Sequence, residues 1–209
     1  CRNKKKTNLK KVNLILGIHN HQPVGNFDFV FEEAYHKAYK PFLEVLSRFP
    51  SIKIGMHYTG IIFDWMDRTY PEFISDLRGL VERGQVEMIG GGFYEPVLPA
   101  IPDEDKIGQI KKLSQYVEER TGYRPQGMWI AERVWEPHLA KPIHQADMRY
   151  AILDDTHFQY AGLDEKEFTG YYVTEEEGHK INIFPISKTL RYTIPFEEPE
   201  KTIDYLSRL

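Results

Sequence analysis

The 209-residue chain is predicted to be an α/β protein in which parallel strands are joined by crossover helices. Two observations support this prediction: strand-like and helix-like segments alternate at least five times, and the loops between them are short. Such alternation is typical of a (β/α) barrel or of a doubly wound sheet. The chain supplies fewer units than the eight of a complete ordinary barrel, which takes about 250 residues.

Five segments carry the near-continuous apolar residues of buried strands, rather than the alternation of half-exposed ones. These predicted strands are residues 12–19, 52–58, 85–89, 128–131 and 150–153. Pro23 and Gly25 follow the first strand and end it. Beyond residue 160 the pattern is weaker, and it predicts strands at 171–174 and 181–186 with a turn between them.

Apolar residues at helical spacing predict helices between and after the strands. The predicted helices are residues 33–48, 61–67, 71–83, 103–120, 138–147 and 201–209. The buried face of the first helix is expected to hold Ala34, Ala38, Phe42, Val45, Leu46 and Phe49. That of the helix at 71–83 is expected to hold Phe73, Ile74, Leu77, Leu80 and Val81. Pro142 is expected to lie in the first turn of its helix or to kink it.

The composition is that of an ordinary globular domain, with 41% hydrophobic and 28% charged residues. A basic, disordered tail is predicted at residues 1–11, followed by one large domain at residues 12–209. The net charge is −4, and about −10 without the six basic residues of the tail. This acidic remainder argues against a nucleic-acid partner.

Cys1 is the only cysteine, which excludes a disulfide framework and a cysteine-rich metal site. A reducing, cytoplasmic compartment is therefore expected. No apolar run approaches the roughly 18 residues of a membrane span, and no apolar signal-peptide core follows the basic start. No membrane partner is expected.

Each of the first five predicted strands is followed by ionisable residues. They are His19, His21, His57, Glu95, Glu132, Asp154, Asp155 and His157. The carboxyl ends of parallel barrel strands meet on one face, where the loops hold the active site. We therefore expect these side chains to converge.

Within this set, Glu132 lies between Trp129 and Trp135 in the stretch GMWIAERVWEP. A carboxylate beside two flat indole rings suits the attack on a sugar whose ring stacks on tryptophan. The alternative is an ion pair between Glu132 and Arg133 that closes a loop beside two core tryptophans. The three glycines at 90–92, just before Glu95, indicate that the backbone there passes close to another group.

Two chemistries could use these residues. A pair of carboxylates cleaves glycosidic bonds, one attacking or activating water and the other protonating the leaving oxygen. Alternatively, His19, His21 and Asp154 or Asp155 could bind a divalent metal whose bound water hydrolyses amides or esters, as in a metal-dependent polysaccharide deacetylase. The His-x-His spacing alone does not decide between them, because both imidazoles are also good donors to sugar hydroxyls.

Three motifs resemble the first three signature regions of glycoside hydrolase family 57: HNHQP at 19–23, GGFYEP at 91–96 and WIAERVWEP at 129–137. The resemblance runs from about residue 12 to the last residue and is strongest to the 4-α-glucanotransferases and α-amylases of that family. It implies a distorted (β/α)7 barrel, an α-glucan or maltooligosaccharide substrate, and a retaining mechanism without a metal or other cofactor.

Carried over from the family, Glu132 would be the nucleophile that forms a covalent glycosyl-enzyme intermediate. His19, His21 and Glu95 would bind the sugar beside the scissile bond, and Trp129 would line that site. Trp135 and Asp155 are also expected to bind substrate. This expectation rests on their positions near the strand ends and not on a motif match.

The family's acid/base aspartate belongs to a fourth signature region that follows a helix like 201–209 and a further strand, and the 209 residues do not contain it. We therefore expect the chain to be the N-terminal catalytic portion of a longer enzyme and to be inactive by itself. An open barrel would expose a strand edge, so marginal stability or self-association into a homo-oligomer is also expected. A further alternative is a non-catalytic glucan-binding relic.

Overall fold

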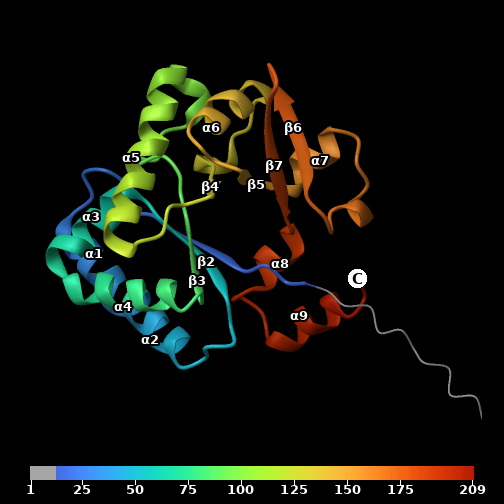
Figure 1. Cartoon of the computed structure of the whole chain (residues 1–209). Coiled ribbons are helices and arrows are strands. Elements are labelled where there is room, and N and C mark those ends of the chain that lie inside the picture. Colours follow the sequence, from blue (N-terminus) through green and yellow to red (C-terminus); the bar gives the residue numbers. More distant parts are fainter. Residues whose placement is uncertain (1–12) are drawn as a thin grey trace, which may run out of the picture. The chain divides into compact units, whose positions relative to one another are not determined.

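The computed structural model describes residues 13–209, so the predicted tail at residues 1–11 lies outside the described residues. The chain divides into a large unit, residues 16–187, and a small unit that contains residues 188–209 and the described residues 13–15. The large unit holds all of the strands among the described residues (Figure 1), and the predicted site residues lie within it.

The large unit is built on two sheets of mainly parallel strands. The first has the order β1-β2-β3, with β1 at Gly17–Asn20, β2 at Ile54–Tyr58 and β3 at Val86–Ile89. The second has the order β4-β5-β7-β6, with β4 at Gly127–Trp129, β5 at Tyr150–Asp154, β6 at Tyr172–Glu176 and β7 at His179–Ile186. A parallel bridge between Gly90 and Met128 links β3 to β4. Among the described strands only β6 runs antiparallel, as one arm of a hairpin with β7. The parallel pairing of the other strands confirms the predicted α/β class.

Helices connect the parallel strands in the predicted order, except that α7 (Asp155–Tyr160) was not predicted. Those of the large unit are α1 at Asp28–Ala34, α2 at Lys40–Ser47, α3 at Gly60–Thr69, α4 at Pro71–Glu82, α5 at Asp103–Thr121, α6 at Ala140–Gln145 and α7 at Asp155–Tyr160. Helix α5 begins with three acidic residues, which suit the positive end of its dipole, and ends at Gly122 in the left-handed conformation. Pro142 lies in the first turn of α6, as expected.

Of the buried face predicted for the first helix, Leu46 is confirmed, but most of the face is wrong. A π-helical turn at Tyr35–Tyr39 joins α1 to α2, and the buried residues are Phe31, Tyr35, Leu43 and Leu46. Phe42, Val45 and Phe49 are instead exposed at 38%, 46% and 53%. A π turn holds more residues than an α turn, so it rotates every later side chain relative to a pattern counted at 3.6 residues per turn.

The first strand begins at Gly17, five residues later than predicted, and Leu14 and Ile15 are exposed. Strand β2 begins at Ile54, and the Leu16 carbonyl accepts a hydrogen bond from the Gly55 amide at 2.9 Å. A strand needs a neighbour with which to form its ladder, and β1 begins only at Gly17 because its parallel neighbour β2 begins at Ile54.

Alternate residues of the strands divide the sheet into two faces. On one face Met56, Met88, Met128 and Ala151 are completely buried beneath the helices. On the other face lie the paired residues His19 and His57 on β1 and β2, and Trp129 at the end of β4. The helices therefore cover one face, and the predicted site occupies the other.

In the small unit, α8 at Lys188–Thr193 was not predicted, and α9 at Pro199–Leu206 overlaps the helix predicted at 201–209. Proline occupies the first turn of α9, where its missing amide hydrogen costs nothing. Among residues 13–209, no helix combines the length and the apolar character needed to cross a membrane.

Candidate active site

The candidate site lies at the carboxyl ends of β1, β2, β3 and β4. These strands are parallel neighbours in the order in which they occur in the sequence, so their ends meet at the same edge. His19 is the third residue of β1, His57 is the fourth of β2, and Trp129 is the last of β4. Glu95 follows β3 in a loop. The predicted convergence of strand-end side chains is thus present for this part of the set.

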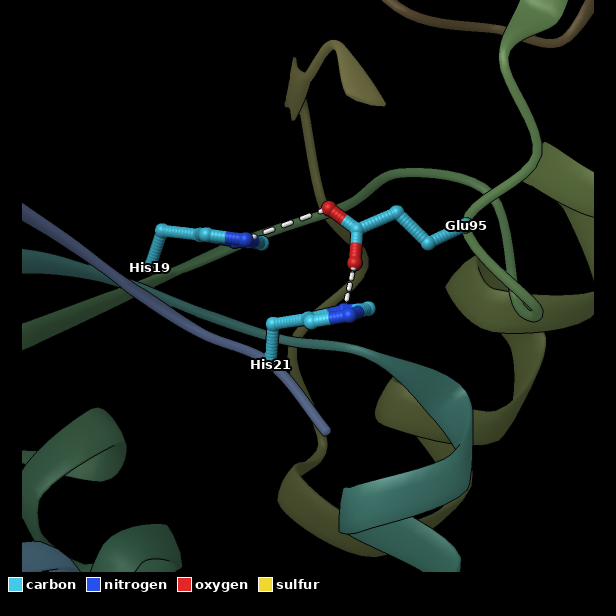
Figure 2. A group of neighbouring side chains, drawn as sticks. All are labelled: His19, His21 and Glu95. Atoms are coloured by element: carbon cyan, nitrogen blue, oxygen red, sulfur yellow. Dashed lines mark ion pairs between the residues drawn. The ribbon is translucent and has the colours of Figure 1, made fainter. Parts of the chain in front are cut away.

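The centre of the site is a carboxylate between two imidazoles. His19 Nε2 lies 3.2 Å from Glu95 Oε1, and His21 Nδ1 forms a short ion-pair contact with Glu95 Oε2. Figure 2 shows the two rings side by side, each directed at one oxygen of Glu95. The Glu95 side chain is 9% exposed and that of His21 41% exposed. The cluster is therefore open to solvent on the His21 side and closed around the carboxylate.

Two further rings enclose His19. The indole of Trp129 stacks on it, with ring centroids 4.5 Å apart and planes inclined by 14°. His57 Nδ1 lies 2.8 Å from His19 Nδ1, and the His57 side chain is almost completely buried. His19 thus occupies one face of the Trp129 indole, and that face is not available for stacking on a sugar ring. Trp129 instead lines one side of the site. His57, which was not among the predicted binding residues, is part of the same cluster.

Burial keeps both inner histidines neutral. Desolvation, with smaller contributions from the nearby charges of His21 and Arg133, lowers the pKa of His19 to about 4. Complete burial lowers the pKa of His57 well below its usual range, and the neighbouring imidazoles add to this effect. At neutral pH these two rings act as uncharged hydrogen-bonding groups.

Opposing effects act on Glu95. Desolvation is the largest and raises the pKa of its carboxyl group, while the charge and the hydrogen bond of His21 lower it. The negative charge of Glu132 also raises it. Glu132 is therefore close enough to the cluster for its charge to act on Glu95.

Glu132 lies in a 3-10 turn, Ala131–Arg133, directly after β4. Its backbone is left-handed, with φ 49° and ψ 9°, and those of Glu95 and Arg133 are also left-handed, with φ 53° and 55°. Non-glycine residues rarely adopt this conformation, and such strain concentrates at functional sites. The turn leaves Glu132 exposed at the edge of the cluster.

The ion pair between Glu132 and Arg133, considered from the sequence, is not formed. Arg133 instead donates from Nε to Asp154 Oδ2 at 2.8 Å, and its carbonyl oxygen lies 2.9 Å from His157 Nε2. Its guanidinium also lies 5.6 Å from the centre of the Trp129 ring. Arg133 and Asp154 thus fasten the Glu132 turn to the end of β5. Their strand-end positions were the only sequence signal for this role.

The glycines before Glu95 allow the close approach that the sequence indicated. A Cβ on Gly91 would lie 2.7 Å from His57 Nε2 and 3.3 Å from the Trp129 carbonyl oxygen. A Cβ on Gly92 would lie 2.6 Å from Cδ of Pro96. Only glycine fits at these points, because the loop that carries Glu95 crosses directly over His57 at Gly91 and folds back on Pro96 at Gly92.

Two predicted residues take other positions. Trp135 is partly buried against the second core cluster, which contains Leu139, Ile143 and Met148. Asp155 is the first residue of α7, after Asp154 at its N-cap. The geometry therefore supports His19, His21, Glu95, Trp129 and Glu132 as one site more strongly than it supports these two.

The arrangement suits two kinds of chemistry. Imidazoles and a carboxylate at hydrogen-bonding distance can bind sugar hydroxyls beside an exposed carboxylate. His19, His21 and Glu95 also place three potential metal-ligand atoms within 4.8 Å of one another. Asp154, one of the two aspartates in the predicted metal-binding alternative, is instead bound to Arg133.

Comparison with known proteins identifies close relatives. A family profile described as "Glycosyl hydrolase family 57" matches residues 15–209. "Alpha-amylase 1" of Dictyoglomus thermophilum is 51% identical over 199 residues, which make up 95% of this chain and 29% of that protein. "4-alpha-glucanotransferase" of Thermococcus litoralis is 47% identical over 201 residues, or 96% of this chain and 30% of that protein.

A solved structure is also similar. The crystal structure of 4-alpha-glucanotransferase from Thermococcus litoralis matches with a TM-score of 0.92 at 47% identity, over 94% of this chain and 31% of that chain. The chain therefore spans about 30% of the length of the relatives that it matches.

Proposed function

The chain belongs to glycosyl hydrolase family 57, and from this membership we propose that its site is the nucleophile-bearing and sugar-binding part of an α-glucan-acting active site. The observation that carries the proposal is the position of Glu132. Its exposed carboxylate is carried by a left-handed turn directly after β4, and its charge acts on the buried carboxyl group of Glu95.

In the proposed reaction Glu132 attacks the anomeric carbon of an α-glucan and forms a covalent glycosyl-enzyme intermediate. The C–O bond to the leaving sugar breaks, and that oxygen takes a proton from a second carboxyl group. Water or the hydroxyl of an acceptor sugar then releases the glycosyl group, with the second carboxylate now acting as base. Water gives hydrolysis, as in an amylase, and a sugar acceptor gives glucan transfer.

His19, His21 and Glu95 are proposed to hold the sugar whose anomeric carbon reacts. Sugar hydroxyls both donate and accept hydrogen bonds, so a carboxylate beside two imidazoles can bind adjacent hydroxyls. Trp129 closes one side of this site, and Trp135 and Asp155 remain proposed substrate contacts farther along the glucan.

The proposal is tested in a hybrid in which this chain replaces the matching segment of the Thermococcus litoralis 4-alpha-glucanotransferase. Replacing Glu132 by glutamine keeps the shape of the side chain and removes the nucleophile. We expect this to reduce turnover of maltooligosaccharides by at least about 10³-fold, the order of loss when a covalent nucleophile is removed. A fluorinated glucosyl fluoride that traps the intermediate should label the peptide containing Glu132, as read by mass spectrometry.

The 209-residue chain alone is expected to show no turnover in the same assay, because the family's fourth signature region is not among its residues. Lys37→Gln, which removes an exposed pair with Glu33, is the matched control and should leave the hybrid's rate unchanged. A hybrid with undiminished activity after Glu132→Gln would overturn the role of Glu132. Substrate binding without turnover in the hybrid would favour the glucan-binding relic.

The metal-dependent deacetylase remains a second candidate because His19, His21 and Glu95 could hold a divalent cation. The same hybrid separates the two candidates. Full activity on maltooligosaccharides in excess chelator excludes a metal-dependent reaction. Release of acetate from an acetylated polysaccharide, lost in chelator and restored by zinc, would favour the deacetylase.

A further inference from the structure

His57 is a buried histidine to which the proposed reaction assigns no role. It is 1% exposed on β2, directly opposite His19 of β1 in the parallel ladder. The Asn20 side chain donates to its backbone carbonyl at 3.0 Å and helps to hold this register. Burying an imidazole costs free energy unless its ring nitrogens form hydrogen bonds. The contacts of the two ring nitrogens of His57 therefore indicate its role.

The first contact joins His57 to His19. Their Nδ1 atoms lie 2.8 Å apart, the ring planes are inclined by 22° and the centroids are 4.9 Å apart. Two neutral imidazoles that meet in this way share one proton, because one nitrogen must donate and the other must accept. The question is which ring carries the proton.

The far side of His57 gives one answer. Its Nε2 is buried, and within residues 13–209 it has no hydrogen-bond partner. The Gly91 loop crosses there so closely that an added Cβ would lie 2.7 Å from Nε2. A buried N–H without an acceptor is rarer in proteins than an acceptor that lacks a donor. The single proton of neutral His57 therefore belongs on Nδ1.

The far side of His19 gives the same answer independently. His19 Nε2 lies 3.2 Å from Glu95 Oε1, and a carboxylate oxygen can only accept. His19 must then carry its proton on Nε2, which leaves its Nδ1 as an acceptor. Both ends of the pair thus indicate the same direction of donation.

We propose that His57 is a positioning residue whose Nδ1–H donates to His19 and thereby fixes His19 as the Nε2–H tautomer directed at Glu95. The low pKa values of both rings agree with this, since each carries only one proton at neutral pH. The order of donation runs from His57 to His19 to Glu95. Its value for catalysis rests on the proposed function, but the tautomers themselves do not.

The tautomers are measured by NMR on the 209-residue chain labelled with 15N in histidine, at neutral pH. Imidazole 15N shifts distinguish a protonated ring nitrogen from a bare one. We expect His57 to be protonated at Nδ1 and bare at Nε2, and His19 to be the reverse. His19 protonated at Nδ1 would overturn the proposal, because the donation would then run toward His57.

Three substitutions separate positioning from packing. The amide nitrogen of asparagine can occupy the place of Nδ1, so His57→Asn should keep His19 protonated at Nε2. Glutamine places its amide near the position of Nε2, and leucine has no donor. His57→Gln and His57→Leu should therefore leave His19 as a mixture of tautomers. Equal effects of all three variants on the His19 signals would show a packing role alone.

Activity gives the second measurement, in the hybrid enzyme. His57→Leu should lower kcat/KM by roughly 10- to 100-fold, the usual effect of removing the partner that orients a functional histidine. His57→Asn should recover most of that loss, and His57→Gln should not. If the hybrid with His57 intact is itself inactive, the proposed function fails, while the NMR result still decides the tautomer.

Discussion

At the scale of single residues, the site combines groups that would be costly to bury alone. Glu95 loses water on burial, and the imidazoles of His19 and His21 replace part of that lost hydration. His19 in turn lies between Glu95 and His57, so it is directed from both sides. Catalytic groups must be held within narrow limits of distance and angle, and this network restricts the rotation of each member.

The two lowered pKa values predict how stability depends on pH. An unfolded histidine has a pKa of about 6.5, while that of His19 in the folded chain is about 4 and that of His57 is also low. Below pH 6.5 the unfolded state therefore binds more protons than the folded state. The free energy of unfolding should fall as the pH is lowered from about 6.5 to about 4, by up to about 1.4 kcal/mol per pH unit for each histidine.

Urea unfolding at pH 7.5, 6 and 5 checks this prediction. Glu95 has a raised pKa and opposes the loss, because its folded form takes up protons more readily. His57→Asn has no imidazole to protonate there, so its stability should fall less steeply than that of the parent chain. Equal slopes for the two proteins would contradict the prediction. Full recovery on return to pH 7.5 is the control against irreversible damage.

At the scale of elements, the loops after the strands determine where the chemistry lies. The Gly91 loop passes over His57 and delivers Glu95, and the turn after β4 delivers Glu132 with a left-handed backbone. Both segments have conformations that are unfavourable for most side chains, and Arg133 ties the second to Asp154 on β5. The site is thus held by strained but well-anchored connections on a rigid sheet.

Substituting Gly91 by alanine tests the close approach. The new methyl group would lie 2.7 Å from Nε2 of buried His57, which cannot move aside. We expect a loss of about 1–3 kcal/mol in the free energy of unfolding, as for other overpacked sites. Urea unfolding measures it.

Gly108→Ala is the matched control for this test. Gly108 lies exposed on α5 with nothing within 4 Å of an added Cβ. Alanine favours a helix more than glycine does, so this variant should gain about 0.5–1 kcal/mol. Equal stability of Gly91→Ala and the parent chain would show that the loop has room to move.

The helices show what local patterns can and cannot predict. The buried residues of α4 agree with the sequence prediction, because 3.6-residue periodicity holds throughout that helix. The face predicted for the first helix fails at the π turn, Tyr35–Tyr39, where Tyr35 stacks on Tyr70 with ring centroids 3.8 Å apart. A pattern counted at constant period does not detect a change in the helix itself.

At the scale of the whole molecule, the large unit contains two buried clusters. One packs around β1, β2 and β3 and the other around β4, β5 and β7. Helix α5 contributes to both, with Leu113 and Val117 in the first and Ile110 in the second. The bridge between Gly90 and Met128 joins the sheets themselves. We therefore expect residues 16–187 to unfold as one cooperative unit.

Tryptophan fluorescence can follow each cluster separately. Trp65 packs against the first cluster and Trp135 against the second. Leu77→Ala, in the first cluster, should cost about 2–5 kcal/mol. If the unit is cooperative, urea unfolding reported by Trp135 shifts as much as that reported by Trp65. The reporters are read singly by changing the other tryptophans to phenylalanine, and a shift confined to Trp65 would contradict cooperativity.

Self-association of the chain stays a prediction. The described array of the large unit ends at β1 on one side and β6 on the other. Edge strands offer unpaired backbone groups to another chain, which is the physical basis of that expectation.

By itself, the sequence determined the alternation of strands and helices and the identity of the residues at the strand ends. These features are local, because they depend on apolar periodicity and on turn-forming glycine and proline. Only the tertiary structure decided which side chains contact one another. Arg133 binds Asp154 rather than Glu132, His57 lies against His19, and Trp135 packs against the second core cluster. Such pairings depend on strand register and backbone turns, which exist only once distant segments have come together.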